Sequence, residues 1–386
     1  MSAAPTPTAA AWQPASPVHP RPDPEHEART AEAIARALRE IPFYRKRGAP
    51  ADAAGATALG RRLGGLPLLR KQDIRATLPK QWVPDGRDTR AELESGALLL
   101  VETSVSTGAR LRVLWTADDQ ARMLDELGRH GTVALESDPL YLAVLAGFAA
   151  SRGRRVDVHG FVQLTYAFTT GAYLRAIRAA FAGPVLQLYG ASEIGVLFME
   201  GEDGRLHHCP FTTHVELLRA RVPTPGAEDV ALVVATSLDR VAMPLVRFVL
   251  GDLVQVDRGA PRRWTSVPAL RSVEGRVDDA VVRPDGALVT PGAMDRALAA
   301  CAELRLWQVN QRAPDRVEVD VVADGDADRV AAEVGACLAP LFEGLAATVR
   351  AVTAIAIEPS GKFRVSKRHF PLDLDRCFER EESAPS

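Results

Sequence analysis

The stretch Val185-Leu186-Gln187-Leu188-Tyr189-Gly190-Ala191-Ser192-Glu193 places a carboxylate directly after an apolar run that is typical of a buried strand. A strand is also expected over 161–165, and a helix over 171–182 separates it from the strand over 185–188. Strand, helix and strand in this order predict a mainly parallel sheet. Because ligands bind at the carboxyl ends of such strands, Glu193 is a candidate ligand for Mg²⁺. A second interpretation stays open, in which Ser192 caps a helix and Glu193 favours its dipole.

Three further segments carry side chains suited to a phosphorylated ligand. The hydroxyl-rich segment Thr103-Ser104-Val105-Ser106-Thr107-Gly108 lies between two expected strands and can offer N–H and hydroxyl groups to phosphates. Asp252 follows Gly251 and precedes an expected strand, where a carboxylate can accept both hydroxyls of a ribose. Lys362 follows Gly361, and its ammonium can neutralise charge on a phosphoryl oxygen. Taken singly, each segment also has the composition of an ordinary turn.

Length and composition are those of a globular protein with two domains. The 386 residues are 47% hydrophobic, and a net charge of −2 argues against a protein that coats nucleic acid. The four cysteines have no CxxC spacing, which indicates neither a zinc ribbon nor a disulfide scaffold. The longest apolar run, over 140–150, is too short for a membrane span, and residues 1–24 lack the pattern of a signal peptide. A cytoplasmic location is therefore expected.

The expected fold class is α/β, with a large N-terminal domain of mainly parallel sheets and a small α+β C-terminal domain joined by a hinge. Proline-rich composition predicts a disordered tail over 1–30, and the large domain is expected over 31–275. After residue 275 short strands alternate with short helices, which predicts the small domain over 276–375. A second tail is expected over 376–386.

Together these segments resemble, in the same order, the motifs of the adenylate-forming superfamily of acyl-CoA synthetases, nonribosomal-peptide adenylation domains and luciferases. Thr103–Gly108 resembles its phosphate loop, and Tyr189–Glu193 resembles its Tyr-Gly-x-x-Glu motif. Arg247 with Gly251-Asp252 resembles its Arg-then-Gly-Asp motif. Gly275-Arg276-Val277-Asp278-Asp279 resembles its hinge motif, and Gly361-Lys362 its terminal catalytic loop. The resemblance is strongest to the phenylacetate–CoA ligase branch and covers roughly residues 31–375.

The resemblance implies a ligase that depends on ATP and Mg²⁺. A small-molecule carboxylic acid attacks the α-phosphate of ATP, which gives an acyl-adenylate and pyrophosphate. The small domain then rotates, and the acyl group passes to CoA, a carrier thiol or an amine. Such a displacement needs positioning and charge neutralisation more than a nucleophilic side chain. This branch often serves secondary metabolism.

The resemblance also implies roles for single residues. Lys362 would bridge the carboxylate and the α-phosphate, and Glu193 with the hydroxyl of Thr107 would hold Mg²⁺. Asp252 would bind the ribose hydroxyls with Arg276 nearby, and Asp278 would be the pivot of the hinge. The other residues expected to contact ATP or AMP are Ser104, Ser106, Thr107, Gly108, Tyr189, Gly190 and Ser192.

Three departures from the family pattern affect the expected site. Val105 stands where the family loop usually has glycine, and a β-branched residue resists the backbone conformation that glycine permits. Tyr173 follows Gly171-Ala172, where the family has an acidic residue near the adenine. The 63 positions from Gly108 to Gly171 are fewer than the family needs, which predicts an internal deletion near 129–139. The deletion removes one wall of the acyl pocket and exposes a sheet edge, so a homodimer or a partner protein is expected to complete the pocket.

These departures leave two alternatives to an ordinary ligase. One is a catalytically impaired subunit of the same fold that binds a nucleotide or a partner. The other is an enzyme that adenylates an unusual small acid. A zinc site is disfavoured, because the spacing of His207, His208, Cys209 and His214 matches no standard site and neighbours on a strand face opposite ways.

Overall fold

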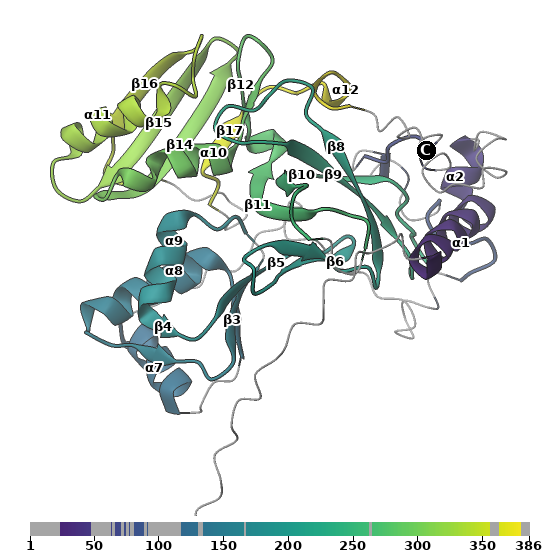
Figure 1. Ribbon diagram of the computed structural model, residues 1–386, viewed down its shortest axis with the longest axis horizontal. Coiled ribbons are helices and arrows are strands. Elements are labelled where there is room, and N and C mark those ends of the chain that lie inside the picture. Colours follow the sequence, from purple (N-terminus) through teal and green to yellow (C-terminus); the bar gives the residue numbers. More distant parts are fainter. Residues whose placement is uncertain are drawn as a thin grey trace, which may run out of the picture.

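The computed structural model describes residues 24–47, 63, 66–70, 73–74, 77, 81–88, 91, 117–129, 134–165, 167–261, 265–355 and 363–379. The described residues form a large domain built on a sheet and a small α+β domain, which is the α/β architecture expected from the sequence (Figure 1). In Figure 1 the small domain, in light green and yellow, lies beyond one end of the large sheet. The purple helices α1 (Pro24–Glu40) and α2 (Pro42–Arg47) lie at the other end.

One continuous sheet forms the frame of the large domain. Over the described residues it has nine strands in the order β1-β3-β5-β6-β7-β11-β10-β9-β8. Parallel pairing is confined to β1, β3 and β5, and the ladders from β5 through β8 are antiparallel. The Tyr189–Glu193 motif therefore lies where the parallel half of the sheet ends. In chain order the strands are β1 (Ala134–Ser137), β3 (Phe161–Leu164), β5 (Val185–Ala191), β6 (Gly195–Glu200), β7 (Leu206–His208), β8 (Thr213–Arg219), β9 (Val230–Ser237), β10 (Phe248–Asp257) and β11 (Ala269–Arg276).

Three helices, α7 (Ala117–Arg129), α8 (Pro139–Ser151) and α9 (Gly171–Ala180), accompany the parallel strands. The side chain of Asp138 accepts a hydrogen bond from the backbone N–H of Leu140 at the start of α8, and Thr170 caps α9 in the same way. The helices share one apolar core with β3 and with the short parallel pair β2 (Val156–Asp157) and β4 (Phe181–Ala182). The capping residues therefore fix where α9 starts, at the side of the large domain that faces the small domain (Figure 1).

Helix α1 begins at Pro24, inside the region expected to be a disordered tail, so that expectation is corrected for residues 24–30. The Thr30 hydroxyl is buried and donates to the carbonyl oxygen of His26 at 2.8 Å. The Arg29 guanidinium donates to the carbonyl oxygen of Phe211 at 2.7 Å and lies 3.0 Å from the Asp239 carboxylate. The Arg29 contacts join the start of α1 to distant parts of the chain, and proline-rich composition alone does not predict them.

The small domain is built on a sheet with the strand order β16-β15-β14-β17 among its described residues. Val330 and Val334 of α11 (Ala327–Leu338) pack with Val319 in the core between the helix and the sheet. The chain enters this domain through the 3₁₀ helix η1 (Val277–Asp279), the pair β12 (Val281–Val282) and β13 (Leu288–Val289), α10 (Pro291–Ala297) and η2 (Leu298–Ala300). The sheet strands are β14 (Leu304–Ala313), β15 (Arg316–Ala323), β16 (Ala346–Ala351) and β17 (Ser366–Arg368).

After β17 the chain turns back to the large domain through residues 370–379, called here the return segment. It contains α12 (Leu374–Cys377), which Figure 1 shows in yellow between the small domain and β8. Phe378 is buried and forms a β-bridge with Ala220, directly after β8. The N–H of Glu379 donates to the carbonyl oxygen of Arg219 at 2.8 Å. The expected boundary at residue 375 is therefore corrected, because residues 376–379 pair with the large domain and are not a free tail.

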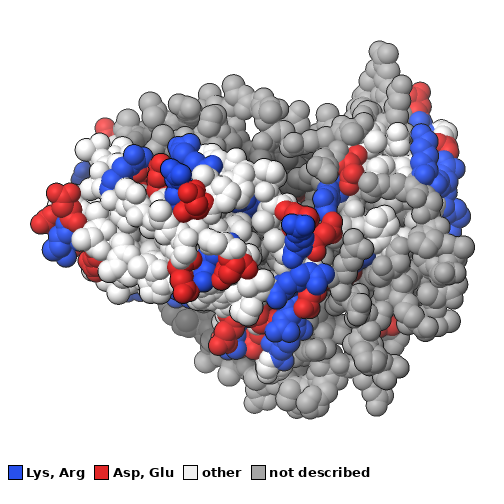
Figure 2. Space-filling model, turned by 90° about the horizontal axis from the view of Figure 1, so that it is seen from above, with Lys and Arg blue, Asp and Glu red and all other residues white. Residues whose placement is uncertain are grey.

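Charges of both signs lie mixed on the described surface seen in Figure 2, with no extended region of basic side chains on that view. A one-signed basic face is the usual mark of a nucleic-acid-binding surface. The mixed pattern agrees with the net charge of −2. Within the described ranges, no helix combines the length and hydrophobicity needed to cross a membrane.

Candidate functional site

Asp252 is the centre of a hydrogen-bonded cluster on β5, β10 and β11. The Tyr189 hydroxyl donates to Oδ2 of Asp252 at 3.0 Å, and Nε of Arg276 donates to Oδ1 at 3.3 Å. The register pairs Asp252 directly with Arg276, so both side chains start from facing positions. Burial, followed by the charge of Asp252, raises the pKa of Tyr189 well above its usual value, so its hydroxyl stays protonated and able to donate. Three residues predicted to contact a nucleotide thus lie together.

Two motif glycines shape the backbone around this cluster. A Cβ atom on Gly190 would lie 2.8 Å from the carbonyl oxygen of Gly195, where β5 turns back into β6. Gly251 has a φ of +85° and lies at an irregularity in the β9–β10 register between Val249 and Leu253. Such bulges re-aim the side chains beside them. Gly190 is therefore required by the close approach of two strands, and Gly251 by the bulge that precedes Asp252.

Glu193 lies in the turn over 192–194 between β5 and β6. No helix starts there, so the interpretation of Ser192 as a helix cap is wrong. Burial lowers the pKa of Arg240, and the Glu193 charge opposes this shift. Burial also lowers the pKa of Arg276, but the charges of Asp252, Asp279 and Glu193 outweigh it. Glu193 therefore acts electrostatically on two arginines, Arg240 and Arg276. Of these, Arg276 also binds Asp252.

The donor chemistry of Glu193 fits Mg²⁺ that arrives with a phosphorylated substrate. Mg²⁺ binds proteins through one or two carboxylates and takes its other ligands from phosphates and water. The described residues contain no group of three His, Cys, Asp or Glu side chains suited to a metal. The described residues therefore form no closed metal cage. A single carboxylate that shares the ion with phosphate oxygens is compatible with this observation. The second predicted ligand, Thr107, lies outside the described residues.

The hinge motif Gly275–Asp279 spans the end of β11 and the whole of η1. Gly275 has a φ of +98°, and a Cβ atom on it would lie 2.6 Å from Cγ of Pro291. The side chain of Asp278, the predicted pivot, is 81% exposed, whereas that of Asp279 is 14% exposed. Burial raises the pKa of Asp279 to about 6, against the opposing charges of Arg364 and Arg276. The two neighbouring aspartates thus have different surroundings.

Arg364 joins the C-terminal motif region to the hinge. Its Nε donates to Oδ1 of Asp279 at 2.7 Å, and its carbonyl oxygen accepts from Nε2 of Gln308 at 2.7 Å. The predicted residues Gly361 and Lys362, directly before the segment 363–379, lie outside the described residues. The same holds for the whole predicted phosphate loop, Ser104, Val105, Ser106, Thr107 and Gly108.

Arg247, the arginine of the Arg-then-Gly-Asp motif, makes a buried ion pair. Its Nη2 lies 2.9 Å from Oε1 of Glu216, and both side chains are nearly inaccessible. Its Nη1 donates to the carbonyl oxygen of Leu66 at 2.5 Å, and its backbone has a φ of +52°. Removing one partner of such a pair leaves an uncompensated buried charge. The structure therefore gives Arg247 a role in fixing the start of β10 and not a place in the Asp252 cluster.

The histidines weighed as zinc ligands separate into two environments. Nε2 of His207 lies 2.9 Å from a carboxylate oxygen of Asp203. His208 is buried and His214 is half-buried beside the buried His26 of α1, with ring centroids 5.6 to 5.9 Å from that of His26. Burial, reinforced by neighbouring positive groups, lowers the pKa of both His208 and His214 to about 3. His208 and His214 are therefore neutral, and their contacts with His26 tie α1 to the sheet.

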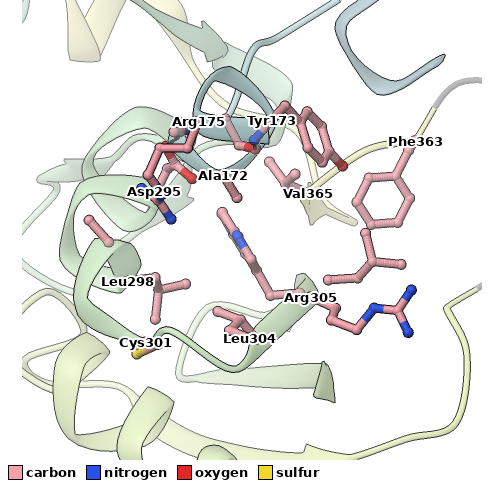
Figure 3. Close-up of a pocket in the computed structure, with 15 residues that line it drawn as sticks. Ala172, Tyr173, Arg175, Asp295, Leu298, Cys301, Leu304, Arg305, Phe363 and Val365 are labelled. Carbon is pink, nitrogen blue, oxygen red and sulfur yellow. Dashed lines mark hydrogen bonds between the residues drawn. The ribbon is translucent and has the colours of Figure 1, made fainter. Parts of the chain in front are cut away.

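A pocket lies between α9 and the small domain (Figure 3). Its polar edge includes Asp295, whose Oδ2 accepts a hydrogen bond of 2.7 Å from the N–H of Gly171. Burial, then the charges of Asp138 and Asp295, raise the pKa of Tyr173 to about 12. Figure 3 shows α9 residues above the space and small-domain residues below it, with Phe363 at one side. The labelled residues are Ala172, Tyr173, Arg175, Asp295, Leu298, Cys301, Leu304, Arg305, Phe363 and Val365.

Sequence reasoning missed Asp279 and Arg364 as members of the site. The sequence does contain a signal for each, namely the second carboxylate of the Asp278-Asp279 pair and a basic residue shortly after Lys362. Nothing in the sequence connects the two, because 85 positions separate them. Their pairing depends on how η1 packs beside the segment 363–379.

No family model matches the chain, and no curated protein matches it by sequence. Among solved structures, the chain is similar to a 2-hydroxyisobutyryl-CoA ligase in the postadenylation state in complex with 2-HIB-AMP. The TM-score is 0.64 at 17% identity, over 93% of this chain and 94% of that chain. The complex of that ligase with R3-HIB-AMP gives a TM-score of 0.63 at 17% identity over 90% of each chain. An open conformation with 2-HIB-AMP and CoA gives 0.54 at 16% identity, over 90% of this chain and 91% of that chain. The chain therefore has the fold of an adenylate-forming ligase.

Proposed function

We propose that this protein is an adenylate-forming ligase that activates a carboxylic acid with ATP and Mg²⁺ and transfers the acyl group to CoA, a carrier thiol or an amine. The observation that carries the proposal is the convergence of Tyr189, Asp252 and Arg276 beside the hinge. These residues come from three sequence motifs that are separated by 63 and 24 positions. Two solved structures of the same fold, at TM-scores of 0.63 and 0.64, hold acyl-adenylates, which supports the same class of chemistry here.

Each residue of the cluster has a chemical task in this proposal. Asp252 accepts the ribose hydroxyls, and Arg276 and Tyr189 hold its carboxylate in one orientation. Glu193 supplies a carboxylate oxygen to Mg²⁺, which neutralises phosphate charge. Lys362 places an ammonium between the attacking carboxylate and the α-phosphate, where negative charge develops. The proposed machinery thus binds, orients and neutralises, and it forms no covalent intermediate with the chain.

The proposal extends to the domains and the acyl pocket. The large domain, over about 31–275, would hold the nucleotide, and the small domain would rotate about Asp278 between the two steps. The shortened region near 129–139 would leave the acyl pocket to be completed by a second copy or a partner protein. The identity between this chain and the 2-hydroxyisobutyryl-CoA ligase is 17%, so the acid of that ligase is one candidate among small and aromatic acids.

A second candidate function is a nucleotide-binding subunit that does not adenylate. Both carboxylate oxygens of Asp252 already have protein donors, Tyr189 on Oδ2 and Arg276 on Oδ1. A ribose must share or displace these donors. Tyr173, which replaces the family's acidic residue, is also part of the wall of the interdomain pocket.

Isotope exchange between ATP and pyrophosphate distinguishes the two candidates. Purified protein is incubated with ATP, Mg²⁺, labelled pyrophosphate and single acids from a panel of aryl acids, short aliphatic acids and 2-hydroxy acids. A ligase gives exchange with at least one acid, and Lys362→Ala lowers it by about 100- to 1,000-fold while ATP still binds. ATP that raises the melting temperature without exchange from any acid supports the non-adenylating subunit. Full exchange in Lys362→Ala removes Lys362 from the mechanism.

A further inference from the structure

Cys301 and Cys337 place two thiols side by side in the small domain. Their sulfur atoms lie 3.7 Å apart, although 36 positions separate the two residues in the chain. Cys301 directly follows η2, and Cys337 lies in the last turn of α11. Within the described ranges, no group of three His, Cys, Asp or Glu side chains is suited to a metal, so metal binding does not account for the pair.

The fold holds both cysteines in place. The N–H of Cys301 donates to the carbonyl oxygen of Leu298 at 3.0 Å, and its carbonyl oxygen accepts from the N–H of Leu304 at 3.2 Å. Cys301 is buried in the apolar core that the small-domain sheet shares with α11, and the partly buried Cys337 packs against the same core. The packing of η2 on α11 therefore brings the two sulfur atoms together, and of the two cysteines Cys337 is the more open to solvent.

We propose that Cys301 and Cys337 are a redox modification site, at which a low-molecular-weight disulfide or a peroxide converts the two thiols into a disulfide. The sulfur atoms of a disulfide are about 2 Å apart, so the pair has to close by about 1.7 Å. Rotation of the partly exposed Cys337 side chain between its staggered conformations can supply this movement. The site goes beyond the adenylation chemistry proposed above and does not depend on it.

The surroundings of the two thiols set the order of the steps. Burial, followed by the neighbouring Cys337 thiol and the Glu333 charge, raises the pKa of Cys301 to about 12, so Cys301 keeps its proton until it reacts. Cys337, which solvent reaches, is the first to attack.

The oxidation balances as a thiol–disulfide exchange. The Cys337 sulfur attacks one sulfur atom of oxidised glutathione, whose S–S bond breaks and releases one glutathione. The Cys301 sulfur then attacks Sγ of Cys337 in the mixed disulfide, and the second glutathione leaves. The two cysteine protons pass to the two glutathione thiolates, and the two electrons lost by the cysteines reduce oxidised glutathione to its thiol. With hydrogen peroxide, Cys337 first becomes a sulfenic acid with release of one water, and attack by Cys301 releases the second.

The disulfide would form at the edge of the interdomain pocket. Figure 3 shows Cys301 below the pocket space, with Leu298 of η2 beside it. The α10–η2 segment that leads to Cys301 also contacts α9, because Asp295 accepts the hydrogen bond from the N–H of Gly171. A disulfide restricts the opening of the chain segments that it joins. Oxidation would therefore fasten the end of the α10–η2 segment to α11 and stiffen this wall of the pocket.

Mapping of cysteine linkages in the full chain tests the proposal. The reduced protein is treated with oxidised glutathione and, separately, with hydrogen peroxide, and the remaining free thiols are blocked with a maleimide. Linked peptides are then identified by mass spectrometry in the wild type, Cys301→Ser and Cys337→Ser. Cys337→Ser changes a partly exposed side chain, so it does not depend on tolerance of a change in the core. Cys377→Ser, which is also partly exposed and lies in the return segment, is the matched control.

We expect one linked pair of peptides, Cys301 with Cys337, in the wild type and in Cys377→Ser, and none in the other two variants. In Cys301→Ser, Cys337 should carry glutathione as a mixed disulfide, whereas in Cys337→Ser the buried Cys301 should stay a free thiol. The bond should form about ten-fold faster in buffer than in concentrated urea, because the fold holds the two thiols together. Two free thiols in the folded wild type after treatment overturn the proposal, as do a linkage to Cys377 and an equal rate in urea.

Hydrogen exchange gives a second readout that needs neither an acid nor ATP. In the oxidised wild type, amides of η2 and of the end of α11 should exchange about three-fold more slowly than in the reduced protein, and dithiothreitol should reverse the change. Cys337→Ser treated with the same oxidant should show no slowing, which separates the effect of the bond from that of the oxidant. Unchanged or faster exchange in the oxidised wild type contradicts the fastening of η2 to α11.

Discussion

The Tyr189 hydroxyl and the Asp252 carboxylate are joined by a hydrogen bond of 3.0 Å across the middle of the large sheet. Tyr189 comes from the last parallel strand, β5, and Asp252 from the antiparallel strand β10, so the bond joins the two halves of the sheet. Because Tyr189 is 8% exposed, its ring is a part of the core and its hydroxyl is a part of the site. The same side chain thus connects the core to the proposed nucleotide site.

Tyr189→Phe removes this bond and leaves the ring in place. We expect the free energy of unfolding to fall by about 2 kcal/mol, as for the loss of one hydrogen bond to a charged group. We expect the Kd for ATP, measured by calorimetry, to rise about three- to ten-fold, because Asp252 is then oriented by Arg276 alone. Tyr141→Phe on the exposed side of α8 is the control and should change neither value. Tighter ATP binding by Tyr189→Phe would show that Tyr189 competes with the ribose.

Glu193→Gln keeps the shape of the side chain and removes the charge proposed to bind Mg²⁺. The apparent affinity for Mg²⁺ in the presence of ATP should fall by about ten-fold, because an amide oxygen is a weaker ligand for a hard cation. Titration of Mg²⁺ in the exchange assay, or against ATP binding, measures this change. The exposed carboxylate of Glu202 provides the control, Glu202→Gln. Identical Mg²⁺ dependence in all three proteins would remove Glu193 from the metal site.

The buried histidines predict that stability falls in mild acid. His208 and His214 have pKa values of about 3 in the folded protein, against about 6.5 when unfolded, so the unfolded chain binds more protons between these values. Each group then lowers the free energy of unfolding by about 1.4 kcal/mol for each pH unit below 6.5. Asp279 offsets the loss of stability from one histidine. Its pKa of about 6 lies above the usual carboxyl value, so protonation of Asp279 favours the folded state as the pH falls toward 4.

Urea unfolding at pH 7.5, 6.5 and 5.5 measures this dependence. The wild type should be most stable at pH 7.5, and His214→Phe should lose less stability between pH 6.5 and pH 5.5 than the wild type does. His159→Gln, on an exposed bend, should behave as the wild type does. A wild type equally stable at all three pH values would mean that the histidine cluster is charged or open in the folded protein.

Gly275→Ala tests the packing of the hinge against α10. Its φ of +98° and the distance of 2.6 Å to Cγ of Pro291 mean that a methyl group brings both backbone strain and a clash. We expect a loss of about 3 kcal/mol in the free energy of unfolding, from roughly equal contributions of the two. Gly204→Ala has a φ of +68° with nothing within 4 Å, so it should lose only about 1 kcal/mol. Similar losses in the two variants would show that the contact with Pro291 is absorbed by movement.

Sequence periodicity predicts a helix or strand best where the segment has a clear apolar stripe and residues that mark where it starts and stops. The helix expected over 171–182 begins at the predicted Gly171 and ends at Ala180. The parallel order of the first strands also follows from strand, helix and strand in sequence. Antiparallel pairing of the later strands is set by tight turns such as 192–194, which in the sequence look like a helix start.

Tyr189, Asp252 and Arg276 were candidates from the sequence, whereas Asp279 and Arg364 were not. Asp252 and Arg276 were identified from motifs, and the register of β10 and β11 shows why they meet. The bond between Asp279 and Arg364 joins residues 85 positions apart, and no local pattern encodes such a distant contact. The order of residues 24–30 and 376–379 was missed for the same reason, because each is stabilised by contacts with distant parts of the chain.

The return segment gives the small domain two attachments to the large one, the hinge at Gly275–Asp279 and the bridge between Phe378 and Ala220. A rigid domain attached at two separate points can rotate only about the line through those points. Any wider turn must first detach Phe378, which is 2% exposed, from the strand edge. Detaching Phe378 exposes apolar surface worth about 2 kcal/mol, and the proposed rotation would have to overcome this cost.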